Sequence, residues 1–279
     1  MSGLLEPFAH DFLRDALLVG SVVSVACALL SCLIVPKGWS LLGDAVSHAV
    51  LPGVVLASAA GLPLALGAFA AGLVCALAAG FVQSRSRVKE DAALGVVFTG
   101  MFAIGLVLLA FLTTEAHITH ILFGNILGIE PADRVQALVA GGATLAVLAV
   151  FGRDLILAAF DPTHARGIGL NPDRLHLLFL ALLSGAVVAG VQSVGVILVV
   201  ALLITPGCIG LLLAERFGRV AAIAAGSAVL ANALGILASY HLNASTAGCI
   251  VLALTGLFGL ALVFAPRRGL LAGWRARAA

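Results

Sequence analysis

Long apolar runs dominate the pattern of hydrophobic and polar positions along the chain. A helix that crosses a membrane needs roughly 20 predominantly apolar residues, and the runs supply nine such candidates. We therefore predict an all-α fold, a bundle of about eight or nine transmembrane helices. The candidates are 16–35, two spans within 45–84, 92–112, 135–152, two spans within 175–214, and two spans within 220–266.

Three of these runs are long enough for two helices, and each contains a signal for a break. The first is interrupted by Gly61-Leu62-Pro63, the second by Gly195, and the third by the polar segment 241–245. Glycine and proline are the residues that most often interrupt a regular helix. We expect the chain to reverse direction at each of these points.

The longest polar interval, 153–174, contains the sequence FDPTHARGIGLNPDR. Asp161 followed by Pro162 is typical of a helix start, with the aspartate as N-cap. Gly167 and Gly169 are suited to closing so short a helix, and Asn171-Pro172-Asp173 begins the next one. The sequence thus indicates a short helix over Asp161–Leu170, although an ordinary surface loop is an equally good interpretation.

The basic residues predict which end of the bundle faces the cytoplasm, because cytoplasmic loops of membrane proteins are enriched in lysine and arginine. If the nine spans alternate and the C-terminus is cytoplasmic, only Arg14 and Arg134 fall outside the cytoplasmic segments. Those segments then hold Lys37, Arg85, Arg87, Lys89, Arg153, Arg166, Arg174, Arg216, Arg219, Arg267, Arg268, Arg275 and Arg277. So strong an asymmetry predicts a cytoplasmic C-terminus.

Composition agrees with a multi-pass membrane protein and excludes several other classes. Hydrophobic residues make up 62% of the 279 residues and charged residues 10%, whereas soluble domains carry about 25% charged residues. The net charge of +2 is too small to indicate nucleic-acid binding. We expect one transmembrane domain over 1–279, with an amphipathic segment at about 1–15 and a basic cytoplasmic tail at 266–279.

The cysteines and the common catalytic motifs give no sign of an enzyme. All five cysteines lie in apolar segments and no CxxC occurs, so we interpret them as small buried hydrophobic residues. The chain contains no GxxxxGK[ST] phosphate-binding loop, no HExxH and no GxSxG. It therefore does not carry an ATPase site of the P-loop kind.

The strongest candidate site is a pair of ionisable residues, Asp44 and His48, in LLGDAVSHAVLPG. Residues four apart share one face of a helix, and no Asp, Glu, Lys or Arg follows between 45 and 84. Ionisable groups at membrane depth usually face a cavity, a partner or a substrate path, and carboxylate with imidazole suits a divalent transition metal. The alternative is a buried pair that only stabilises the helix.

Other histidines are weaker candidates. His117 and His120, with Glu115, could form an external metal-capture patch, and His241 lies in another external turn beside Asn243. We favour a simple surface role for all of them. A stripe of small residues, Gly72, Ala76 and Gly80, is typical of close-packed membrane helices, and we assign no function to it.

Five blocks in order make this chain resemble the membrane permeases of bacterial ABC importers for manganese, iron and zinc, over about residues 5–264. They are KGWSLLGDAVSHAVLPGV, RSRVKEDAALGVVF, ILFGNILGI, FDPTHARGIGL and GVILVVALLITPG. The resemblance implies a helical permease that pairs with a second permease subunit, either a copy of itself or a similar paralogue. It also implies a cytoplasmic ATP-binding subunit docked around Asp161–Leu170 and an extracytoplasmic metal-binding protein. Since such permeases are usually described with about eight spans, one of the nine could be re-entrant or broken.

From this resemblance we expect a permease subunit of an ATP-driven importer in the inner membrane of a bacterium. The cargo would be Mn²⁺ first, with Fe²⁺ or Zn²⁺ as alternatives, and it would pass Asp44 and His48 near the permease dimer axis. The chain would not be an enzyme itself, because ATP would be bound by the partner subunit. The alternative is a secondary metal transporter driven by protons.

Overall fold

The structure is a computed structural model, and it describes residues 11–111, 128–129, 131–265 and 269. Over this part of the chain nine segments are long and apolar enough to cross a membrane, which confirms the predicted fold and span number. The helices are α1 (Asp11–Ile34), α2 (Ser40–Ala49), α3 (Leu51–Ala59), α4 (Leu64–Arg85), α5 (Glu90–Phe111), α7 (Pro131–Phe160), α8 (Pro162–Gly167), α9 (Pro172–Val194), α10 (Val196–Leu213), α11 (Phe217–Leu242) and α12 (Thr246–Phe264).

The chain reverses where the sequence predicts it. Gly61 has a positive φ of 66° in the turn between α3 and α4, and Gly195 has a φ of 89° between α9 and α10. Asn243 ends α11 in the left-handed conformation, with φ 47°. These are conformations that glycine and asparagine adopt at low cost.

Three spans differ clearly from their predicted bounds. The first begins at Asp11 rather than Ala16. The second begins at Ser40 rather than Ala45 and is interrupted at Val50, because Asp44 remains helical on a partly exposed face instead of ending the span. The fifth, α7, is 30 residues long and continues through Arg153 and Asp154. At 1.5 Å per residue a helix of this length exceeds the roughly 30 Å apolar core of a bilayer, so its charged end can lie in water.

The two terminal segments of the predicted domain fall largely outside the described residues. Residues 1–10 and all of 266–279 except Gly269 are not described. Residues 11–15 form the first turn of α1, and Leu13 is already buried in the core.

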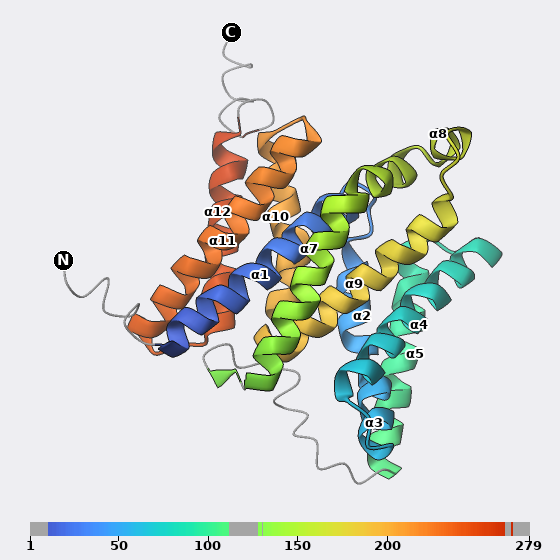
Figure 1. Cartoon of the computed structure of the whole chain (residues 1–279), viewed down its shortest axis with the longest axis horizontal. Helices are drawn as coiled ribbons and strands as arrows, with labels where there is room; N and C mark the ends of the chain where they lie inside the picture. Colours follow the sequence, from blue (N-terminus) through green and yellow to red (C-terminus); the bar gives the residue numbers. More distant parts are fainter. Residues whose placement is uncertain (1–10, 112–127, 130, 266–268, 270–279) are drawn as a thin grey trace.

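Helix α1 runs through the middle of the bundle and packs against α7, α9, α10 and α11 (Figure 1). Glycines allow two of these approaches: a methyl group at Gly20 would meet the side chain of Asn232, and one at Gly207 would meet Ser31. Asn232 is fully buried, and its amide donates to Ser21 Oγ at 3.2 Å. Small residues and hydrogen-bonding side chains of this kind hold helices together in lipid, where no hydrophobic force does so.

Helices α3, α4 and α5 form a group at one side of the bundle (Figure 1). Its tightest point is a reciprocal contact of two glycines, where α3 crosses α4. A methyl group at Gly53 would overlap the carbonyl oxygen of Gly67, and a methyl group at Gly67 would overlap that of Gly53. The two backbones can approach this closely only because neither residue has a side chain.

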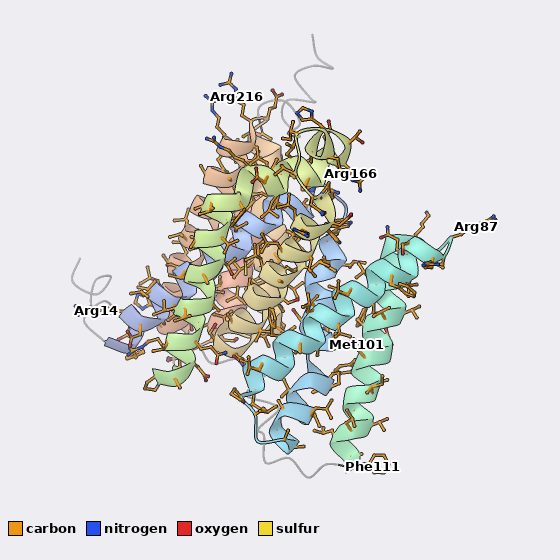
Figure 2. All side chains as sticks on the ribbon, turned by 45° about the vertical axis from the view of Figure 1, so that its right-hand side comes forward. Arg14, Arg87, Met101, Phe111, Arg166 and Arg216 are labelled. Atoms are coloured by element: carbon orange, nitrogen blue, oxygen red, sulfur yellow. The ribbon has the colours of Figure 1, made fainter. Side chains whose placement is uncertain are left out.

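Polar contacts tie together the ends of α1, α7 and α9 that are predicted to be external. Arg134 at the start of α7 pairs with Asp15 of α1, and Gln136 donates to Gln192 near the end of α9. Arg14 lies toward the lower part of the view in Figure 2, whereas Arg87, Arg166 and Arg216 lie higher. The two basic residues predicted to be external, Arg14 and Arg134, thus belong to adjoining helix ends.

Candidate functional site

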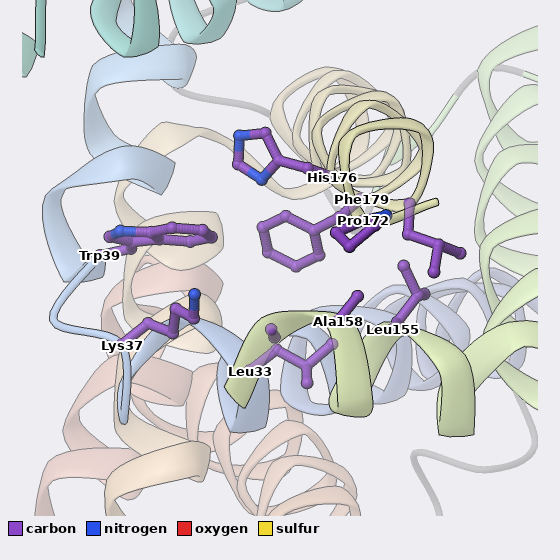
Figure 3. A pocket seen from close by; sticks show the side chains of 10 residues that line it. Leu33, Lys37, Trp39, Leu155, Ala158, Pro172, His176 and Phe179 are labelled. Atoms are coloured by element: carbon purple, nitrogen blue, oxygen red, sulfur yellow. The ribbon is translucent and has the colours of Figure 1, made fainter. Parts of the chain in front are cut away.

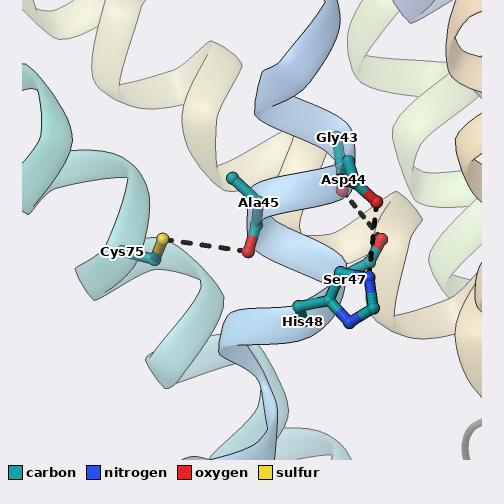
Figure 4. A network of polar contacts seen from close by, with 6 residues as sticks. All are labelled: Gly43, Asp44, Ala45, Ser47, His48 and Cys75. Atoms are coloured by element: carbon teal, nitrogen blue, oxygen red, sulfur yellow. Dashed lines mark hydrogen bonds and ion pairs between the residues drawn. The ribbon is translucent and has the colours of Figure 1, made fainter. Parts of the chain in front are cut away.

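Asp44 and His48 lie side by side on one face of α2. His48 Nε2 is 3.4 Å from Asp44 Oδ1, and Figure 4 shows both side chains on the same side of the helix. Each side chain is 36% exposed, whereas all the other residues between Leu42 and Val50 are buried. The pair is therefore the accessible polar part of a helix that is otherwise enclosed.

The opposite side of α2 is packed closely enough to hold the pair in position. Gly43 lies against Leu203 of α10, and Gly72 of α4 lies against Val46. Ser47 is fully buried and its hydroxyl donates to the carbonyl of Gly43 at 2.7 Å (Figure 4), so it is already paired within the helix. The helix cannot rotate without breaking these contacts.

Two aromatic rings of α5 flank the imidazole. The ring of His48 is 6.2 Å from that of Phe98 and 5.9 Å from that of Phe102, measured between centroids. This neighbourhood was not predicted, although the spacing of the two phenylalanines, four apart, places them on one helix face. They form an apolar wall at one side of the pair.

The break between α2 and α3 comes two residues after His48. Pro52 stands in the first turn of α3 and has no N–H with which to bond the carbonyl of His48, four residues earlier. Irregular backbone at membrane depth is tolerated where it lines a cavity or is buried in protein, and in transporters the freed carbonyls of broken helices coordinate cations. At the junction Val50 keeps helical backbone angles, with φ −69° and ψ −21°, so what the proline removes is the usual helical N–H partner of the His48 carbonyl.

One copy of the chain does not provide a complete metal site in the part that the structure describes. No group of three or more His, Cys, Asp and Glu side chains there is close enough to hold a metal ion. Transition metals usually take four or more ligands. The pair can thus supply two ligands to a cation, and the remainder must come from elsewhere.

The weaker histidine candidates do not join this pair. His117, His120 and Glu115 lie outside the described residues. His241 is exposed at the end of α11, where its ring is 5.5 Å from that of Tyr240. Two further histidines, His164 and His176, belong to α8 and α9 at the predicted cytoplasmic end and are also apart from the pair.

The short helix in the polar interval is present as α8, Pro162–Gly167. Asp161 is its N-cap, and its carboxylate accepts from the backbone N–H of His164 at 2.8 Å. Gly169 has a φ of 88° and ends the turn, and the side chain of Asn171 caps α9. Arg166 lies 3.7 Å from Asp173, so one ion pair connects α8 to the first turn of α9.

Comparison with known proteins gives a consistent result along the chain. The model of a family described as the ABC 3 transport family matches residues 9–265. The manganese transport system membrane protein MntB of Synechocystis is 48% identical over 275 residues, which cover 98% of this chain and 90% of that protein. The chelated iron transport system membrane protein YfeD of Yersinia pestis is 48% identical over 259 residues, 93% of this chain and 87% of that protein.

A solved structure gives the same result in three dimensions. PsaBC from Streptococcus pneumoniae in complex with Fab includes a chain that matches with a TM-score of 0.85 and 32% sequence identity. The match covers 96% of this chain and 97% of that one. The likeness in sequence and in fold therefore extends over nearly the full length of both proteins.

Proposed function

The chain belongs to the ABC 3 transport family, and from this premise we propose that it is the permease subunit of an ATP-driven importer of a divalent transition metal. Mn²⁺ and Fe²⁺ are the first candidate cargoes, because similar proteins are named for manganese and for chelated iron transport. Zn²⁺ is a third, since imidazole also suits it.

The observation that carries this proposal is the accessible Asp44–His48 pair on an enclosed helix. A carboxylate is a good ligand for Mn²⁺ and a neutral imidazole for Fe²⁺ and Zn²⁺. With only two side-chain ligands from each copy, the pair binds weakly enough for the ion to leave again, as a site on a conduction path must. The helix that holds the pair is interrupted just beyond it, at Val50, where Pro52 enters the first turn of α3.

A second permease subunit would complete the site. In a two-fold dimer the same surface patch meets itself, so two copies of the pair facing the axis would offer two carboxylates and two imidazoles. A similar paralogue with the same pair would serve equally. We propose that the ion passes between the two subunits at this level.

The energy would come from a cytoplasmic ATP-binding subunit docked around Asp161–Leu170. Helix α8 lies at the predicted cytoplasmic end, and only the short segment 168–171 separates it from the membrane-spanning helix α9. An extracytoplasmic metal-binding protein would deliver the ion from the other side. The subunit would then reside in the cytoplasmic membrane of a bacterium.

The proposal is tested by uptake of radioactive Mn²⁺ into proteoliposomes that contain this chain, its ATP-binding partner and its metal-binding protein. We expect uptake to require ATP. We also expect unlabelled Fe²⁺ or Zn²⁺ to compete with Mn²⁺, more strongly the more tightly the importer binds that ion. Uptake that instead proceeds without ATP and follows an imposed proton gradient would establish the alternative, a proton-coupled secondary transporter.

The role of α8 leads to a separate prediction for its cap. Asp161→Ala removes the carboxylate that accepts from His164, and the loss of such a cap costs a helix about 1 kcal/mol, roughly a fivefold change in helix population. We expect several-fold slower ATP-driven import with unchanged metal affinity of the permease. The measurement is import rate and ATP hydrolysis in the same proteoliposomes.

Asp161→Ser is the matched control for this prediction, because serine also caps helices. It should restore most of the import rate. If Asp161→Ala imports as fast as the wild type and the serine variant does not differ from it, α8 does not couple the two subunits.

A further inference from the structure

A cavity of about 350 Å³ opens at the predicted cytoplasmic end, between α2, α4, α5 and α9. This volume is at the lower end of the range of about 300–1,000 Å³ for ligand pockets in proteins. Its wall is mostly aliphatic, with Leu42, Leu94 and Leu180 on three of the helices, and polar groups appear only toward the helix ends. Leu77 and Phe81 of α4 line it and are exposed, so the cavity is open to the outer surface of the helix bundle.

The stripe of small residues on α4 produces this space. At Gly72 the stripe brings α4 into contact with α2, since a methyl group there would lie 3.0 Å from Val46. Two turns further on, a methyl group at Gly80 would meet nothing within 4 Å. The helices therefore diverge toward the cytoplasmic end, and Ala76 and Gly80 line the gap.

A lysine side chain lies against one aromatic ring of the cavity wall. Trp39 lies at the start of α2, with Lys37 Nζ 4.7 Å from its ring centroid and the ring of His176 at 5.4 Å. Figure 3 shows the Lys37 side chain on one side of the Trp39 ring and His176 on the other. The same two rings also line a second cavity of about 40 Å³, into which Lys37 faces. Tryptophan is enriched at this depth of membrane proteins, where lipid headgroups begin.

A second cation lies against an aromatic ring of the cavity on helix α4. Arg85, at the end of α4, places its guanidinium 5.8 Å from the ring of Phe81. The described residues that line the cavity include no Asp, Glu, Lys or Arg, so Lys37 and Arg85 stand just outside it, against the lining rings of Trp39 and Phe81. The start of α2 adds to the positive potential, because it has no side-chain cap and no acidic residue in its first turn.

We propose that this cavity binds an anionic phospholipid of the cytoplasmic leaflet. One acyl chain lies along Ala76 and Gly80, and the phosphate lies at the basic rim near Arg85, with Lys37 beyond Trp39. An apolar slot with cations just beyond its cytoplasmic rim matches the two parts of such a lipid. Basic pockets between spans on the cytoplasmic side recognise anionic headgroups in this way.

Trp39 provides the probe for the test. The chain has two tryptophans, so the full chain with Trp274→Phe reports on Trp39 alone. We would reconstitute it in nanodiscs and titrate phosphatidylglycerol with brominated acyl chains, which quench nearby tryptophan fluorescence, against brominated phosphatidylcholine. The proposal predicts half-maximal quenching at about fivefold lower mole fraction of the anionic lipid, the effect of one basic group near the membrane surface.

Two variants address the two parts of the site. Gly80→Leu fills the acyl slot without a backbone clash and should remove the preference for phosphatidylglycerol; Arg85→Gln, on an exposed side chain, should remove most of it without affecting the fold. Gly142→Leu is the matched control, because Gly142 is an exposed glycine of α7 with equally open space. Its Trp39 fluorescence should show the same preference for quenching by phosphatidylglycerol as that of the parent chain.

Several results would overturn the proposal. Equal quenching by the two lipids would show that no headgroup is recognised, and an unchanged preference in Gly80→Leu would place the lipid elsewhere. If neither lipid quenches Trp39, the cavity is occupied by protein, either by a second copy or by another segment of this chain. Arg85→Gln decides the question if Gly80→Leu fails to fold.

Discussion

The variant Asp44→Ala/His48→Ala is expected to lose metal import while its fold is retained. Both side chains are partly exposed, and the close contacts of α2 with α10 and α4 are made by Gly43 and Val46. Removing residues that only orient metal ligands already costs 10–100-fold in affinity. Removal of the ligands themselves should therefore lower the import rate by at least about 100-fold.

The measurement is ATP-driven uptake of radioactive Mn²⁺ in proteoliposomes, with ATP hydrolysis measured in parallel. Hydrolysis should continue, since the pair does not contribute to nucleotide chemistry. Asp154→Ala is the matched control, because it removes a carboxylate from α7 at the predicted cytoplasmic end and should import normally. Normal import by the double variant would show that Asp44 and His48 are structural, and the proposed path would be wrong.

The second large effect is expected at the crossing of α3 and α4. Gly53→Ala puts a methyl group onto the carbonyl oxygen of Gly67, which is part of a helix backbone and cannot move aside like a flexible side chain. Overpacking of this kind costs about 1–3 kcal/mol and occasionally more. We expect a clear drop in thermal stability and in the yield of folded protein, measured on detergent-solubilised chain.

Gly95→Ala is the contrasting substitution. A methyl group at Gly95 of α5 meets nothing within 4 Å, and alanine is favoured over glycine in a helix by up to about 1 kcal/mol. This variant should be neutral or slightly more stable. If both variants have the same melting temperature as the wild type, the crossing is looser than the structure has it.

Sequence alone was sufficient for the spans and their breaks because lipid imposes a single requirement on each segment. A run of apolar residues must form a helix to satisfy its own backbone, so hydropathy identifies it. Gly61, Gly195 and Asn243 end helices through local backbone preferences that are equally readable. The N-cap Asp161 was predictable for the same reason, since its hydrogen bond to His164 is made three residues away.

Features that depend on packing between helices were not predictable. The second span was expected from Ala45 because Asp44 seemed to end the apolar run, whereas α2 begins at Ser40 and exposes that one face. The contact of His48 with Phe98 and Phe102 joins two spans about fifty residues apart, and one sequence carries no sign of it. The stripe at Gly72 and Gly80 was visible as a pattern. The sequence does not show that Gly72 packs against α2 whereas Gly80 lines a cavity.

The reversal at Gly195 limits which parts of the chain an external protein can touch. A single residue separates α9 from α10, and Gly195 itself is buried. The turn at Ala60–Pro63 and the turn at Asn243–Ser245 are both exposed. Among the turns that the structure describes at this end, those two offer an exposed backbone to a soluble protein that delivers cargo, whereas the turn at Gly195 does not. An epitope tag inserted at position 195 would have to displace buried residues at the ends of α9 and α10.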